Sequence, residues 1–124
     1  MIQVGSFLHV SDNSGAQTIQ CIKVLQKKRN NCGFLGDTIV VAVQEIVKKQ
    51  NSKIKRGQIY KAVILETSLA TQRKDGSSFR FHRNAAILIS AQGSPLGTRI
   101  QGISSYELRR KNCAKLLSLS GANI

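Results

Sequence analysis

The chain has 124 residues and carries 19 Lys and Arg against six Asp and Glu, a formal charge of +13 at pH 7. This length is enough for one domain with a hydrophobic core, and 41% hydrophobic residues exclude a wholly disordered chain. No apolar tract approaches the length of a membrane span, and no long basic amphipathic helix is present. The strong positive charge therefore favours a nucleic-acid partner over a membrane surface.

Five segments in chain order have the apolar, β-branched composition of strands, and turn residues separate them. In one of them the alternation of apolar and polar residues breaks at Cys21-Ile22, which predicts a β-bulge or apolar cover on both sides. Short strands of this kind favour a small five-stranded β-barrel, which hides its edges, so the predicted fold class is mainly β. The predicted strands are residues 7–10, 18–25, 38–47, 58–66 and 85–90.

A projecting β-ribbon is predicted over residues 70–83, with Asp75-Gly76 as a two-residue hairpin turn. Residues that pair across a hairpin share a face, so this turn would put Arg73 and Arg80 together. The opposite, packing face would then hold Ala70, Phe79 and Phe81. A register shift of one residue would mix these faces. Because an isolated polar ribbon is marginal in water, we expect an anionic partner; an ordinary solvated hairpin is the alternative.

The C-terminal part, residues 93–124, differs in character from the rest. Residues 103–111 and 113–119 are each predicted to form about two helical turns, too short to be stable alone. These helices must therefore dock on the barrel or on a partner. We predict a single domain over residues 1–124, in which residues 1–92 form the barrel with its ribbon.

Basic residues cluster in segments separated by charge-poor strands, which predicts basic loops on a neutral scaffold. The alternative is that the basic residues only keep the protein soluble, but proteins usually achieve solubility with positive and negative side chains interspersed. Lys and Arg on loops and a ribbon, without an aromatic-rich strand, suit phosphate and shape recognition of folded RNA, although composition alone does not separate RNA from DNA. The candidate RNA-binding residues are Lys27, Lys28, Arg29, Lys48, Lys49, Lys53, Lys55, Arg56, Arg73, Lys74, Arg80 and Arg83.

Catalysis has little support in the sequence. His9 and His82 are the only side chains that titrate near neutrality, and the six carboxylates are scattered singly. The three cysteines form no C-x-x-C pair, so neither a zinc site nor a redox motif is indicated, and Cys21 reads as a core residue. We predict no enzymatic activity, no metal and no cofactor.

Several motifs occur in a characteristic order over nearly the whole chain. They are D-N-S-G-A at 12–16, C-I-K-V at 21–24, G-D-T-I at 36–39, the stretch 62–88, G-T-R-I at 97–100, E-L-R at 107–109 and K-L-L-S-L at 115–119. In these motifs the chain resembles the L-fourteen family of large-subunit ribosomal proteins. The resemblance implies a five-stranded barrel, a projecting ribbon and a C-terminal region with short helices.

The resemblance also implies a function and partners. It implies a structural constituent of the large subunit that binds large-subunit rRNA beside neighbouring ribosomal proteins, and an intersubunit bridge with small-subunit rRNA. The positions that match the family's exposed joining surface, where a ribosome-silencing factor docks, are Thr98, Arg99 and Lys115. We expect a mitochondrial ribosome in the matrix, with plastid or bacterial cytoplasm as alternatives. A free-standing RNA-binding module and an enzyme using His9 or His82 remain the competing classes.

Overall fold

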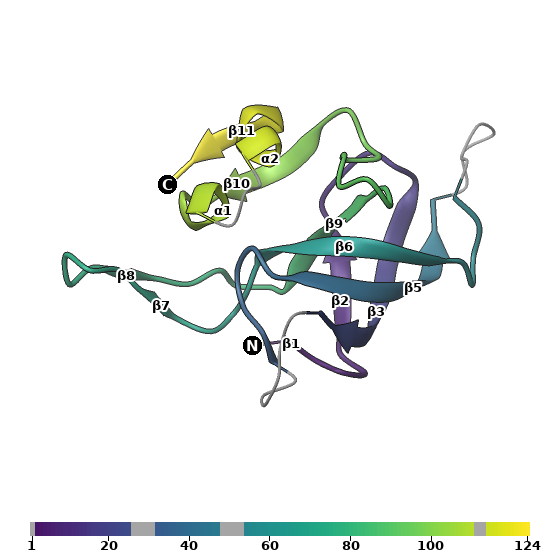
Figure 1. Ribbon diagram of the computed structural model, residues 1–124, viewed down its shortest axis with the longest axis horizontal. Coiled ribbons are helices and arrows are strands. Elements are labelled where there is room, and N and C mark those ends of the chain that lie inside the picture. Colours follow the sequence, from purple (N-terminus) through teal and green to yellow (C-terminus); the bar gives the residue numbers. More distant parts are fainter. Residues whose placement is uncertain (1, 26–31, 48–53, 111–113) are drawn as a thin grey trace.

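The computed structural model describes residues 2–25, 32–47, 54–110 and 114–124 (Figure 1). The five predicted strands form a closed barrel in the order β2-β3-β5-β6-β9, which confirms the predicted fold class. Neighbouring strands are antiparallel, except that β2 and β9 pair in parallel and thereby close the barrel. The bounds are β2 (Phe7–Val10), β3 (Ala16–Val24), β5 (Thr38–Ile46), β6 (Ile59–Glu66) and β9 (Ala85–Ile89).

The barrel interior is filled by the alternate apolar side chains of its strands. In β5, Ile39, Val41 and Val43 are buried, whereas the residues between them are partly exposed, as expected for a strand with one face on the core. The predicted bulge in β3 is present, because the register with β5 shifts between Cys21 and Lys23. Cys21 is buried there, which confirms its prediction as a core residue.

A second apolar cluster lies on the outside of the barrel, over β6 and β9. Ala62 and Ile64 pack in the interior cluster, whereas Val63 and Leu65 pack outside. The outer side chains are covered by the C-terminal region, which includes α1 (Glu107–Arg110) and α2 (Ala114–Leu119). This arrangement confirms that the C-terminal helices dock on the barrel. The covering residues are Ile100, Leu108, Leu116 and Leu117.

The predicted helix over residues 103–111 begins too early. Ile103 and Ser104 belong to a strand, β10 (Ile100–Ser104), which pairs in parallel with β11 (Ser120–Asn123), and α1 begins at Glu107. The buried Ser104 hydroxyl lies 2.7 Å from the Ser120 hydroxyl and also donates to the Asn123 side chain. The side-chain contacts between distant residues therefore override the weak helical pattern.

Two further pairs of short strands accompany the barrel, and Ile2 of the first pair is buried in the barrel core. β1 (Ile2–Gln3) pairs with β4 (Cys32–Gly33), and β7 (Thr71–Gln72) pairs with β8 (Ser78–Phe79). The second pair is the predicted ribbon, and it projects away from the barrel (Figure 1). None of the helices in the described ranges is long and apolar enough to cross a membrane.

Candidate nucleic-acid and subunit interface

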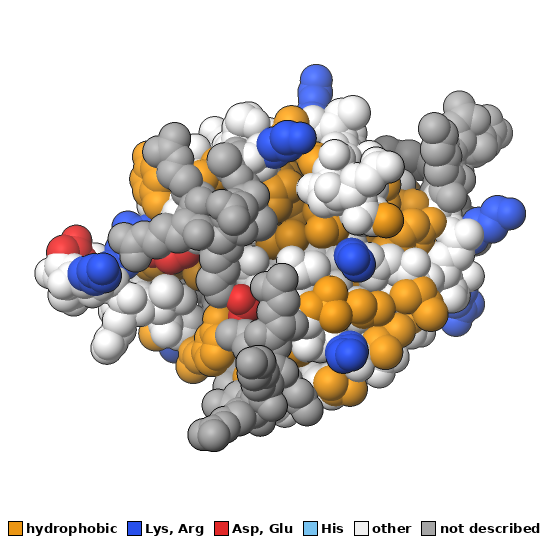
Figure 2. Space-filling model, in the orientation of Figure 1, with side chains coloured by type: hydrophobic (Ala, Val, Ile, Leu, Met, Phe, Trp, Pro, Cys, Tyr) orange, Lys and Arg blue, Asp and Glu red, His pale blue; other side chains and the backbone are white. Residues whose placement is uncertain are grey.

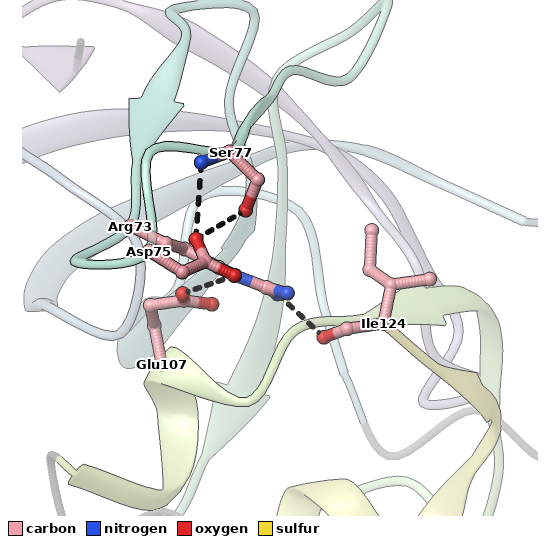
Figure 3. A network of polar contacts seen from close by, with 5 residues as sticks. All are labelled: Arg73, Asp75, Ser77, Glu107 and Ile124. Atoms are coloured by element: carbon pink, nitrogen blue, oxygen red, sulfur yellow. Dashed lines mark hydrogen bonds and ion pairs between the residues drawn. The ribbon is translucent and has the colours of Figure 1, made fainter.

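The turn of the ribbon differs from the predicted two-residue turn. Thr71 lies opposite Phe79, and the Arg73 main-chain N–H donates to the Ser77 carbonyl at 2.8 Å. The loop therefore begins one residue earlier than predicted. Each residue of the first ribbon strand consequently pairs with a residue one position earlier than predicted. The Asp75 carboxylate accepts bonds from the Ser77 main-chain N–H and hydroxyl at 3.0 and 2.7 Å (Figure 3), and these bonds lower the pKa of Asp75.

The shifted register separates the two arginines that were predicted to share a face. Because side chains alternate along a strand, Arg73 lies on the face of Phe79, and Arg80 points to the opposite face. The Arg73 guanidinium carbon lies 4.7 Å from the centre of the Phe79 ring, which confirms that Arg73 and Phe79 share a face. The predicted contact between Phe79 and Phe81 is present as an edge-to-face pair with ring centres 5.8 Å apart.

Arg73 connects the ribbon to the C-terminal region (Figure 3). Its Nε lies 2.9 Å from Glu107 Oε1, and its Nη2 donates to the Ile124 main-chain oxygen at 2.7 Å. Desolvation acts to raise the pKa of Glu107, but hydrogen bonds to its carboxylate, above all from Arg73, together with the Arg73 charge outweigh it, so this pKa lies below 4.5. The guanidinium therefore has internal partners that a phosphate would have to displace.

Arg83 is also paired within the protein. Its Nε donates to Glu66 Oε2 at 2.9 Å, and the Glu66 side chain is buried at the end of β6. Gly102 leaves room for this carboxylate, since a Cβ at that position would lie 2.9 Å from Glu66 Oε1. A buried carboxylate without its cation would be costly, so the pair holds Arg83 against the barrel.

The remaining described members of the predicted RNA-binding set are exposed. Lys74 and Arg80 lie on the ribbon, and Lys55 and Arg56 lie in the loop that precedes β6. In the part of the chain that the structure describes, no carboxylate pairs with these four side chains. The other candidates lie outside the described residues: Lys27, Lys28, Arg29, Lys48, Lys49 and Lys53.

The loop that carries Thr98 and Arg99 is fixed by a side chain that the sequence analysis did not single out. Asn13 Nδ2 donates to the Thr98 hydroxyl at 2.8 Å, and Asn13 Oδ1 accepts from the main-chain N–H groups of Thr98 and Arg99 at 2.8 and 3.2 Å. At the adjacent Gly97, a Cβ would lie 2.8 Å from Asn13 Oδ1 and 2.9 Å from Asp12 Cβ. Gly97 therefore permits the close approach of the two segments.

Asp12 anchors the same junction to the barrel. Its carboxylate accepts from the Ser14 main-chain N–H, the Ser14 hydroxyl and the Leu88 main-chain N–H at 3.2, 2.5 and 3.2 Å. Burial raises the pKa of Asp12 despite these bonds. The sequence shows D-N-S-G and G-T-R-I as two separate motifs. Only the folded chain shows that the two motifs contact each other.

Neighbouring elements carry the three candidate residues of the subunit face, all of which are exposed: Thr98, Arg99 and Lys115. Arg99 directly precedes β10, and α2, which carries Lys115, contacts β10. The two exposed histidines come from neighbouring segments, because His9 in β2 lies opposite Ala85, which is three residues after His82. Within the described residues, no three His, Cys, Asp or Glu side chains are close enough to hold a metal ion. The absence of catalytic activity and of a cofactor stays a prediction.

Comparison with known families agrees with this geometry. The family model described as Ribosomal protein L14p/L23e matches residues 1–124. The closed five-stranded barrel and the low helix content are consistent with this family's fold. The chain therefore belongs to the L14p/L23e family of ribosomal proteins and is a structural constituent of the large ribosomal subunit.

Proposed function

We propose that the chain binds large-subunit rRNA mainly through phosphate contacts from its ribbon and basic loops. The observation that carries this proposal is the division among the arginines and lysines. Arg73 and Arg83 are paired with carboxylates, whereas Lys74 and Arg80 are exposed on the ribbon without one. Lys55 and Arg56 add a second exposed pair on the loop before β6. Unpaired cations on projecting segments suit a polyanion with an irregular surface.

A salt titration of the purified protein with a large-subunit rRNA fragment tests this proposal. Each phosphate contact contributes about one unit to the slope of log affinity against log salt concentration. Replacing Lys74 and Arg80 together by Gln should lower the slope by about two, taking about one unit for each. Lys61→Gln on the barrel is the matched control and should leave the slope unchanged. A wild-type slope near zero, or equal binding to a DNA duplex of the same length, would contradict rRNA recognition of this kind.

We further propose that Thr98, Arg99 and Lys115 contribute to the face that meets the small subunit. The support is the family assignment together with a loop that three hydrogen bonds from Asn13 hold in place. A preorganised loop loses little conformational entropy when small-subunit rRNA or a silencing factor binds. Packing of these side chains against large-subunit rRNA is the alternative.

Changing these three residues together to Ala separates the two alternatives. If they form a joining surface, large subunits should contain the protein in normal amounts, but subunit joining and binding of a silencing factor should weaken. Sucrose-gradient sedimentation measures both quantities in one preparation. Accumulation of large subunits that lack the protein would instead show that the three residues serve assembly.

We propose a mitochondrial ribosome as the location, with plastid and bacterial ribosomes as alternatives. The support is the resemblance to bacterial and organellar members in length, combined with many departures from bacterial sequences at solvent-side positions. The family assignment establishes association with the ribosome and does not distinguish these compartments. Cell fractionation followed by sedimentation in high salt tests the proposal. Co-sedimentation with cytosolic or plastid large subunits would contradict it.

A further inference from the structure

An apolar stripe crosses the outer face of the barrel, in contrast to the basic loops that project from the barrel. We define the barrel stripe by its members, Phe7, Ile22, Val40, Ala42 and Ile59. The strand register aligns part of it in one row, because Phe7 lies opposite Gln20, Gln20 opposite Ala42, and Ala42 opposite Ile59. Phe7 is 61% exposed, Ile22 42% and Ile59 65%.

The polar side chain within this row is already satisfied. Gln20 accepts a hydrogen bond from the Gln44 side chain at 3.2 Å and donates to the Gly5 carbonyl at 3.3 Å. A partner that covers Gln20 therefore does not need to supply new hydrogen bonds for both ends of its amide. Figure 2 shows hydrophobic side chains gathered over β5 and β6, with Lys or Arg side chains beside them.

Two lysines border the stripe at one end. Lys23 lies opposite Val40, and Val40 lies opposite Lys61, so the two exposed ammonium groups stand on either side of a valine. At the opposite end, the Glu45 carboxylate accepts a hydrogen bond from Thr18 at 3.4 Å. The border beside Val40 is therefore positively charged and complements a carboxylate.

The chain itself shows how such a surface is covered. On the neighbouring outer face, Val63 and Ile87 are buried under Leu116 and Leu117 of the C-terminal region. None of the elements in the described ranges covers the barrel stripe in this way. Exposed apolar side chains gathered on one face, with a charged rim, are typical of a protein interface.

We propose that the barrel stripe binds a neighbouring ribosomal protein through a segment with aliphatic side chains and a carboxylate facing Lys23 and Lys61. This proposal rests on the assignment to the large subunit. RNA fits the stripe poorly, because phosphates gain nothing from Ile22 or Ile59. A second copy of the chain also fits poorly, because two chains of charge +13 would meet with lysines on both sides.

Site-specific photocross-linking in purified, salt-washed large subunits tests the proposal. The cross-linker p-benzoylphenylalanine replaces Ile59, and in a second preparation it replaces Leu69, an apolar residue that is 44% exposed near the ribbon. Position 59 should cross-link to a protein, whereas position 69 should not yield the same product. Adding Lys23→Glu and Lys61→Glu should lower the yield at position 59 about fivefold, equivalent to about 1 kcal/mol.

The charge-preserving pair Lys23→Arg and Lys61→Arg is the matched control and should leave the protein cross-link unchanged. Three results would overturn the proposal while the chain still sediments with large subunits: a cross-link from position 59 to rRNA, a cross-link to a second copy of the chain, or no cross-link. A yield that does not respond to the two charge reversals would also overturn it. Absence of the wild-type chain from large subunits would instead refute the ribosomal assignment itself, so the two failures are distinguishable.

Discussion

Replacing Arg73 by Gln should destabilise the protein without changing the salt dependence of its RNA affinity. The ion pair with Glu107 joins side chains that are 30% and 21% exposed, so screening limits its contribution to about 0.5–1 kcal/mol. The charged hydrogen bond to the Ile124 main-chain oxygen contributes about 1 kcal/mol. The contact with the Phe79 ring adds about 0.5 kcal/mol. Because these contributions share one side chain, we expect a net loss of about 2 kcal/mol.

Urea and thermal denaturation measure this loss directly. For a domain of this length, about 2 kcal/mol corresponds to a decrease in Tm of about 6–10 °C. Glu107→Gln should destabilise by about 1 kcal/mol, since it removes the ion pair and leaves the other contacts of Arg73. The double variant should then show a coupling energy of about 0.5–1 kcal/mol between the two positions.

The salt titration provides the second measurement. Arg80→Gln should lower the slope of log affinity against log salt by about one, whereas Arg73→Gln should leave it unchanged. The opposite result would refute this division of roles: an unchanged Tm for Arg73→Gln together with a slope reduced by about one. Arg73 would then contact a phosphate, and its internal partners would contribute little to stability.

Three other predictions follow from the described contacts. Asn13→Ala should cost about 1–2 kcal/mol in urea denaturation and speed hydrogen exchange at the Thr98 amide, because its hydrogen bonds are lost. Gly97→Ala should cost about 1–3 kcal/mol through overpacking, whereas Gly121→Ala, whose Cβ would meet nothing within 4 Å, should cost less than about 0.5 kcal/mol. The pKa of Glu107 is lowered by folding, so its stabilising effect is present above its ordinary value of 4.5 and is lost as the pH falls through the folded value. The stability difference between wild type and Glu107→Gln should therefore shrink as the pH is lowered below 4.5.

The barrel strands could be predicted from sequence because their signal is local. The alternation in residues 38–47 predicts a strand, and β5 (Thr38–Ile46) ends within one residue of that expectation. The register of the ribbon was not predictable in this way. Asp75-Gly76 indicates a turn, but the loop length depends on the bonds from Ser77 to the Asp75 carboxylate.

The C-terminal region shows a second limit of local patterns. β11 (Ser120–Asn123) has a composition with little tendency to form strands, and it exists because it pairs with β10 and bonds to Ser104. Asn13 likewise depends on distant segments, because its contacts with Thr98 and Arg99 span 85 and 86 residues. Such roles become visible when the fold brings the segments together.

The distribution of the few carboxylates decides what the many cations can do. With six acidic residues against 19 basic ones, carboxylates are too few to pair one-to-one with most of the cations, and charge alone does not identify the cations that are paired. Glu107 pairs with Arg73 across 34 residues, and Glu66 pairs with Arg83 across 17. These two pairs lie where the ribbon meets the C-terminal region and where it leaves the barrel. The carboxylates thus orient the ribbon, and this orientation determines the direction in which Lys74 and Arg80 are exposed.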